Sequence, residues 1–172
     1  MVPEIFIFDV DGVLTTGHFL YSSEGKSYKI FGKDDSDGLS LLKSQLPIKF
    51  VSGDHRGFSI SKKRVEDMKF DIELVSTNKR VDWIKENYDI NKVIYMGDGI
   101  FDHFVFKEVL YSIAPSNAHK FAKDNSDFIT SSSGGNGAVA EACLHILAKF
   151  FEAYNPNNKL NKNTKFSGEW QN

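Results

Sequence analysis

Short apolar runs alternate with amphipathic segments along most of this chain. The first run, Ile5–Phe8, is continuous, which is typical of a strand buried on both faces of a sheet. Further short strand-like segments, which include some polar residues, follow at residues 48–51, 71–75, 92–96, 110–114 and 127–130, and helical periodicity or a helix-start signal separates most of them. Strands that alternate with helices predict a parallel sheet with helices on both faces. We therefore expect an α/β fold with a doubly wound sheet.

Two regions depart from this alternation. Aromatic segments at residues 19–21 and 27–31 flank a polar connection with a glycine, which predicts a β-hairpin. A final helix, expected from Ala138 to about Tyr154, carries two apolar stripes, which either core packing or a subunit contact would explain. The composition then turns to Asn, Lys, Pro and Ser. We expect one domain over residues 1–154 and a flexible tail over residues 155–172.

Composition narrows the possible partners. The 172 residues suggest a single domain, and the net charge of −2 gives no reason to expect binding to nucleic acid or to an anionic membrane. No apolar run approaches the roughly 18 residues needed to cross a bilayer, and no signal-like segment opens the chain. Cys143 is the single cysteine, so an internal disulfide is excluded. We expect a soluble, cytoplasmic protein.

Polar side chains follow four of the predicted strands. Taken alone, each is an ordinary turn or helix-cap residue. Because ligands in such folds bind at the carboxyl ends of the strands, these residues should converge on one edge of the sheet. In chain order they are Asp9 and Asp11, Ser52 with Gly53, Lys79 in the first turn of a helix, and Asp98 with Asp102. Carboxylates as close as Asp9 and Asp11 repel each other unless a cation neutralises them, so a divalent ion is expected there.

The segment from Phe8 to Thr15, Phe-Asp-Val-Asp-Gly-Val-Leu-Thr, resembles the first motif of the haloacid dehalogenase superfamily. The order acid pair, serine, lysine, acid pair resembles the remaining motifs of that superfamily. No stretch is long enough for a cap domain, and the resemblance over roughly residues 4–152 is to the capless branch of 3-deoxy-D-manno-octulosonate 8-phosphate (KDO 8-phosphate) phosphatases. It implies a Rossmann-like doubly wound sheet with the hairpin as a flap beside the active site.

The resemblance also implies a mechanism. Asp9 would be the nucleophile that forms an aspartyl-phosphate, and Asp11 would protonate the leaving group and then activate water. Mg²⁺ would be held by Asp9, the backbone carbonyl of Asp11 and Asp98.

Other motif residues would bind the phosphoryl group. Ser52, with Gly53, and Lys79 would hold its oxygens, while Asp102 would orient Lys79 or a metal-bound water. The implied substrate is a small phosphorylated metabolite of capsule or lipopolysaccharide biosynthesis. Members of the branch are typically homotetramers in which a neighbouring subunit covers the active site, so the same assembly is expected here.

The chain departs from the branch at its predicted pocket mouth. Asp34, Asp54 and Asn136 stand where the branch commonly has arginine. An acidic mouth would repel a carboxylate, which favours a neutral or amine-bearing phosphomonoester. KDO 8-phosphate or a nine-carbon sugar-acid phosphate remains the alternative, because a partner subunit could supply cations. The candidates for specificity residues are Asp54, His18, His55 and Asp35.

Functions of another class are open at this point. A phospho-receiver domain uses a similar set of residues, but its acceptor aspartate ends the third strand, where this chain has Val75-Ser76-Thr77. A phosphotransferase or mutase would normally carry a cap. A non-catalytic binding protein would have no use for both Asp9 and Asp11.

Overall fold

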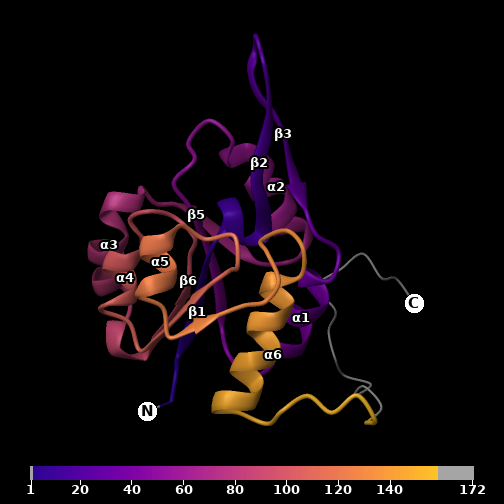
Figure 1. The fold of residues 1–172 in the computed structure, drawn as a ribbon, viewed down its shortest axis with the longest axis vertical. Coiled ribbons are helices and arrows are strands. Elements are labelled where there is room, and N and C mark those ends of the chain that lie inside the picture. Colours follow the sequence, from indigo (N-terminus) through magenta and orange to yellow (C-terminus); the bar gives the residue numbers. More distant parts are fainter. Residues whose placement is uncertain (1, 159–172) are drawn as a thin grey trace.

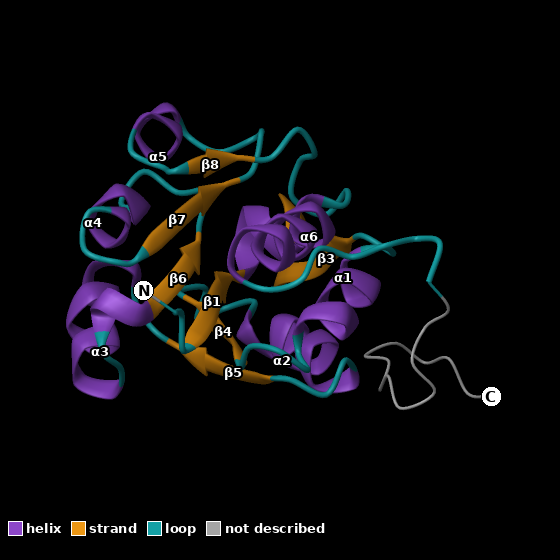
Figure 2. Ribbon diagram, turned by 90° about the horizontal axis from the view of Figure 1, so that it is seen from below, coloured by secondary structure: helices purple, strands orange, loops and turns teal. Residues whose placement is uncertain are grey.

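A six-stranded parallel sheet lies between two layers of helices (Figures 1 and 2). This computed structural model describes residues 2–158. The strand order is β5-β4-β1-β6-β7-β8, and each neighbouring pair is parallel. The strands are β1 Ile5–Asp9, β4 Ile48–Ser52, β5 Asp71–Leu74, β6 Val93–Met96, β7 Tyr111–Ala114 and β8 Phe128–Ile129. The predicted doubly wound fold is confirmed.

The central strand β1 contributes to both halves of the core. Successive side chains of a strand point to opposite faces, so Phe6 and Phe8 join one apolar cluster while Ile5 and Ile7 join the other. The first cluster lies under α1 Asp35–Leu42, α2 Phe58–Asp67 and α6 Ala138–Phe150. The second lies under α3 Arg80–Asn87, α4 Asp102–Phe106 and α5 Lys120–Asp124. Burial on both faces explains why β1 is apolar without alternation.

The predicted hairpin is an antiparallel pair, β2 Thr15–Ser22 and β3 Gly25–Phe31. It projects as a flap from the end of the molecule where β1 finishes (Figure 1). Within residues 2–158, this flap is the one insertion between β1 and α1, and no cap domain is present.

The last helix is shorter than predicted. It ends at Phe150, before the expected Tyr154, and packs against α1. Its side chains Val139, Cys143 and Ile146 are fully buried, so core packing accounts for one apolar stripe. Most of the predicted tail, residues 159–172, lies outside the described residues. None of the helices in residues 2–158 is long and apolar enough to cross a membrane.

Candidate active site

A cavity of about 220 Å³ opens at the carboxyl edge of the sheet, beside the flap. It brings together residues from β1, the flap, the loop after β4 and the start of α3. Its lining consists of Asp9, Asp11, Gly17, Phe19, Lys26, Gly53, Asp54, Thr77 and Arg80. Four of the sequence-predicted site residues, Asp9, Asp11, Gly53 and Asp54, are in this set.

Asp9 ends β1 and is 7% exposed. Its two carboxylate oxygens accept hydrogen bonds from both terminal nitrogens of Arg80, at 2.8 and 3.1 Å, and Oδ1 also accepts one from the Val10 amide at 2.7 Å. Burial raises the pKa of Asp9 to about 6, although the neighbouring guanidinium opposes this shift. Asp9 is therefore a fixed carboxylate at the base of the cavity.

Arg80 occupies the position that the sequence assigned to Lys79. It is 2% exposed and also donates to the Tyr95 hydroxyl at 2.6 Å and to Asp102 Oδ1 at 3.1 Å. Lys79 is exposed and lines a separate depression with Trp83. The sequence predicts that Lys79 holds the phosphoryl oxygens, but Lys79 is not among the residues that line the cavity with Asp9.

A signal for Arg80 is present in the sequence. Residues four apart lie on the same face of a helix, and Arg80 precedes the buried Ile84 by four. Lys79 shares its face with Trp83, which is only partly buried. The apolar stripe of α3 therefore indicates Arg80 as the inward-facing cation.

Asp11 stands beside Asp9 on the loop that follows β1. Its Oδ1 lies 2.6 Å from the Lys29 ammonium, and its Oδ2 accepts a hydrogen bond from the Ser52 hydroxyl at 3.0 Å. Ser52 ends β4 as predicted, but it is fully buried, its hydroxyl donates to Asp11, and it is not among the residues that line the cavity, where the sequence predicts it to bind the phosphoryl group. Lys29 comes from the flap, and no sequence pattern pointed to it, because its approach depends on how the hairpin packs on the sheet.

Asp9, Asp98 and Asp102 form a carboxylate cluster with one oxygen of each within 4.8 Å of the others. Burial beside Asp9 and Asp102 raises the pKa of Asp98 to about 8. Oxygen ligands in this number and spacing suit a hard divalent cation, which would relieve their mutual repulsion. Gly12 leaves the necessary space: its φ is +84°, and a Cβ there would lie 1.9 Å from Asp98 Oδ2.

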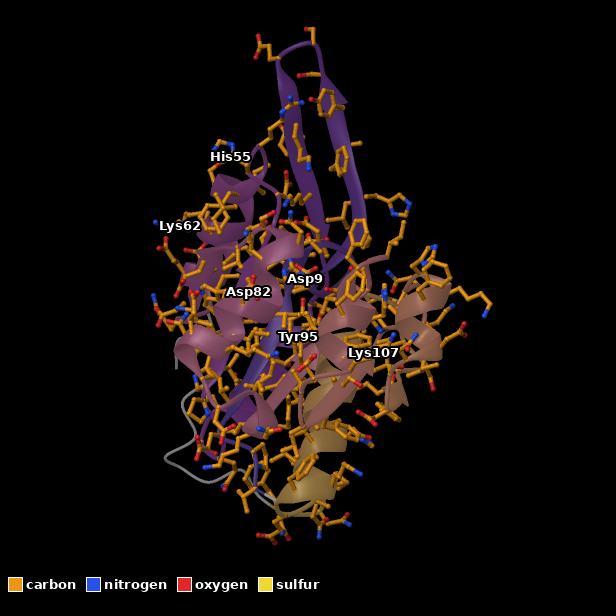
Figure 3. The ribbon with its side chains drawn as sticks, turned by 90° about the vertical axis from the view of Figure 1, so that its left-hand side faces the viewer. Asp9, His55, Lys62, Asp82, Tyr95 and Lys107 are labelled. Carbon is orange, nitrogen blue, oxygen red and sulfur yellow. The ribbon has the colours of Figure 1, made fainter. Side chains whose placement is uncertain are left out.

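Asp102 is fully buried behind the cluster. Besides Arg80, it accepts hydrogen bonds from the Gly99 amide at 2.8 Å and the Tyr95 hydroxyl at 2.9 Å. Figure 3 shows Tyr95 close to Asp9 in the interior of the molecule. Asp102 and Tyr95 therefore orient Arg80 and not the exposed Lys79, while the role of Asp102 beside a metal-bound water stays a prediction.

Three of the predicted specificity residues do not line the cavity. His18 and His55 are exposed and do not line the cavity, and His55 is at the periphery in Figure 3. Asp35 is fully buried at the start of α1, where it accepts a hydrogen bond from the Ala140 amide of α6 at 3.1 Å. Burial raises the pKa of Asp35 to about 6. Asp35 connects two helices and does not contact the cavity.

The pocket mouth is less acidic than its sequence indicated. Asp54 Oδ2 lies 2.5 Å from the Lys26 ammonium and 2.8 Å from that of Lys29. Burial acts to raise the pKa of Asp54, but the hydrogen bonds from these lysines lower it to about 2. The flap thus supplies two lysines that pair with Asp54, so the prediction that Asp54 makes the pocket mouth acidic is corrected.

At the carboxyl edge of the sheet, the cavity combines a carboxylate held by a buried guanidinium with a second acid and a neighbouring carboxylate cluster. This combination suits metal-dependent phosphoryl transfer. Comparisons with known proteins agree. The family model for haloacid dehalogenase-like hydrolases matches residues 83–142. The 3-deoxy-D-manno-octulosonate 8-phosphate phosphatase KdsC of Salmonella typhi is 31% identical over 156 residues, covering 84% of this chain and 80% of that protein.

Solved structures give the same result. The 3-deoxy-D-manno-octulosonate 8-phosphate phosphatase of Moraxella catarrhalis, in complex with magnesium, phosphate and KDO, has a TM-score of 0.67 at 29% identity, covering 85% of this chain and 86% of that one. The cobalt-bound Haemophilus influenzae phosphatase has a TM-score of 0.75 at 28% identity, covering 85% and 88%. This chain belongs to the haloacid dehalogenase-like hydrolases, in the capless branch that contains these phosphatases. It is a phosphatase, and its acidic cluster suits the divalent metal that phosphatases of this family use.

Proposed function

We propose that this protein is a Mg²⁺-dependent phosphomonoesterase that hydrolyses a phosphorylated sugar acid, of the KDO 8-phosphate kind, in cell-surface glycan biosynthesis. The observation that carries the proposal is the bidentate hold of Arg80 on Asp9, with Asp11 and the carboxylate cluster beside it. The named activity of the relatives supports the substrate class. The ion pairs of Asp54 remove the charge argument for a neutral or amine-bearing substrate.

The chemistry follows from the positions of the side chains. An oxygen of Asp9 attacks phosphorus, the bond between phosphorus and the leaving oxygen breaks, and Asp11 gives that oxygen its proton. Asp11 then takes a proton from water as the water attacks the aspartyl-phosphate, which releases inorganic phosphate and regenerates Asp9. Mg²⁺, bound by Asp9, Asp98 and the backbone of Asp11, would supply positive charge between the carboxylates and the phosphoryl group.

The phosphoryl oxygens need donors that are already in place. Arg80 presents a planar, permanently charged fork next to Asp9, and Gly53 and Thr77 line the same cavity. Cations and donors fixed before the reaction stabilise the charge on the phosphoryl oxygens in the transition state. Ser52, which donates to Asp11, is placed to orient the acid that protonates the leaving group.

Substitution of the nucleophile tests the proposal. In Asp9→Asn, we expect phosphate release from KDO 8-phosphate with Mg²⁺ to fall by roughly 10³-fold or more, because the amide cannot form the acyl-phosphate. Asp34→Asn is the matched control, since the Asp34 side chain is exposed and outside the cavity. Activity of Asp9→Asn within tenfold of wild type, or wild-type protein that binds KDO 8-phosphate without turnover, would contradict an aspartyl-phosphate enzyme.

A further inference from the structure

Lys26 of the flap lines the cavity and has no counterpart among the predicted motif residues. We propose that Lys26, whose ammonium lies over the ring of Phe19, binds the carboxylate of the sugar acid and so determines the preference for leaving groups that carry a carboxylate. This inference rests on the function proposed above. Both residues line the cavity together with Asp9 and Asp11. The subsite is therefore within one cavity of the reacting carboxylates.

The Lys26 ammonium has hydrogen-bond donors that the described residues do not use. A lysine carries three N–H donors, and among the described residues the Lys26 ammonium has one hydrogen-bond partner, Asp54 Oδ2 at 2.5 Å. Its side chain is 10% exposed, so the ammonium is largely shielded from solvent while it faces the cavity. An ammonium in this setting interacts more strongly with a carboxylate than a solvated surface lysine does.

Lys29, three residues along the same strand, provides the contrast. Its side chain is 1% exposed, and its ammonium contacts Asp11, Asp54 and the Ser61 hydroxyl at 2.6, 2.8 and 2.8 Å. All three of its donors are thus used within the protein. Lys29 connects the flap to the catalytic loop, which leaves Lys26 as the flap cation that is available to substrate.

Lys26 completes the charge balance of the flap contacts. Lys26 and Lys29 share a single oxygen of Asp54, and Lys29 also contacts Asp11, so the two lysines together offset these two carboxylates. The flap lysines lower the pKa of Asp54 to about 2, so this carboxylate is ionised at neutral pH. Without the charge of Lys26, Lys29, Asp54 and Asp11 would carry a net charge of −1, which would repel the carboxylate of a substrate.

Phe19 fixes the position of the ammonium. The Lys26 nitrogen lies 3.8 Å from the centre of the Phe19 ring, within the range of a cation–π contact. Phe19 is 47% exposed and borders the cavity, so part of its ring is available to the C–H face of a sugar. The pair combines an aromatic surface with a cation, which matches the two chemical features of a sugar acid.

The test compares two substrates that differ in the carboxylate. Steady-state kinetics of Lys26→Met are measured with KDO 8-phosphate and with sedoheptulose 7-phosphate, which has a similar chain but no carboxylate. We expect kcat/KM for KDO 8-phosphate to fall about 10- to 100-fold, mainly through KM, with a change of less than about threefold for the neutral sugar. Lys26→Arg should retain the preference. Lys33→Met, at an exposed lysine beyond the flap, is the control and should behave as wild type.

Each alternative result has a distinct meaning. Equal losses for both substrates would show that Lys26 only holds the flap in place, and an unchanged preference would show that the carboxylate binds elsewhere; both overturn the inference while the phosphatase function stands. A wild-type enzyme that does not prefer KDO 8-phosphate over the neutral sugar would instead refute the proposed substrate class, and the inference with it. Melting temperatures of all variants separate these outcomes from misfolding.

Discussion

Arg80 is the residue on which the charge balance of the site depends. It lies among Asp9, Asp102 and Tyr95 with 2% of its surface exposed. A buried charge is tolerated only when it is paired and hydrogen-bonded, and the two carboxylates meet that condition. Arginine suits the position because its planar fork can hold both oxygens of Asp9 at once and cannot lose its proton.

Substitutions at the two neighbouring cations test this assignment. For Arg80→Ala we expect kcat/KM to fall by roughly 10²-fold or more, since the phosphoryl oxygens lose a fixed donor at the site of developing charge. Arg80→Lys should recover part of the loss, because a point charge remains without the bidentate geometry. Lys79→Ala should stay within about threefold of wild type. The reverse ranking, with Lys79→Ala the inactive variant, would restore the assignment first made from the sequence.

The flap carries several exposed large apolar side chains. Its outward side chains are between 47% and 67% exposed; they are Phe19, Leu20, Tyr21, Tyr28 and Ile30. Apolar surface gathered in this way on one element usually marks an interaction site. We propose that the flaps contribute to the homotetramer expected for this branch.

Mass measurement of the native protein tests the assembly. We expect light scattering to give a tetramer, and the double substitution Tyr28→Ser with Ile30→Ser to shift the mass toward smaller species, because it removes apolar surface from the contact. Phe121→Ser, which changes a similarly exposed aromatic residue on α5, is the matched control and should remain tetrameric. A wild-type monomer at micromolar concentration would contradict the proposal.

The glycine loop before α6 has a structural role at the site. The side chain of Asn117 donates to the Gly12 carbonyl at 3.0 Å and accepts from the Gly134 amide at 2.6 Å. A Cβ at Gly134 would lie 1.9 Å from the Gly12 oxygen, so only glycine permits this approach. The loop therefore supports the backbone that carries Asp9 and Asp11.

At the scale of the whole molecule, the carboxylate cluster couples stability to pH and metal. Burial and neighbouring carboxylates raise the pKa of Asp9 to about 6 and that of Asp98 to about 8, from an ordinary value of 3.8. An acid whose pKa is raised in the folded state binds protons more tightly there than in the unfolded chain. Its stabilising contribution is complete below the unfolded pKa and is lost as the pH rises through the folded pKa.

In EDTA, we therefore expect the melting temperature to fall by roughly 5–10 °C between pH 4 and pH 8 from this cluster. Saturating Mg²⁺ should raise the melting temperature most at pH 8, because the metal binds the deprotonated carboxylates. Asp98→Asn is the control, since it removes one of the titrating groups and should reduce both effects. A metal effect that is larger at pH 5 than at pH 8 would contradict this account.

The sequence by itself determined the order of the strands and helices and the identity of the residues at the strand ends. Asp9 and Ser52 end β1 and β4, and Asp11 and Asp98 follow the ends of β1 and β6 by two residues, so local chain direction was enough to bring them to one edge. These short-range relations are encoded within a few residues of each strand.

Only the tertiary structure decided which cations serve the site. The choice of Arg80 over Lys79 depends on which face of α3 is buried, and the pairing of Lys26 and Lys29 with Asp54 depends on how the flap packs on the loop after β4. Long flexible side chains can reach in several directions, and partners 71 residues apart, as Asp9 and Arg80 are, meet only through the packed fold. The carboxylates of this site follow from the chain, whereas its positive charges follow from the packing.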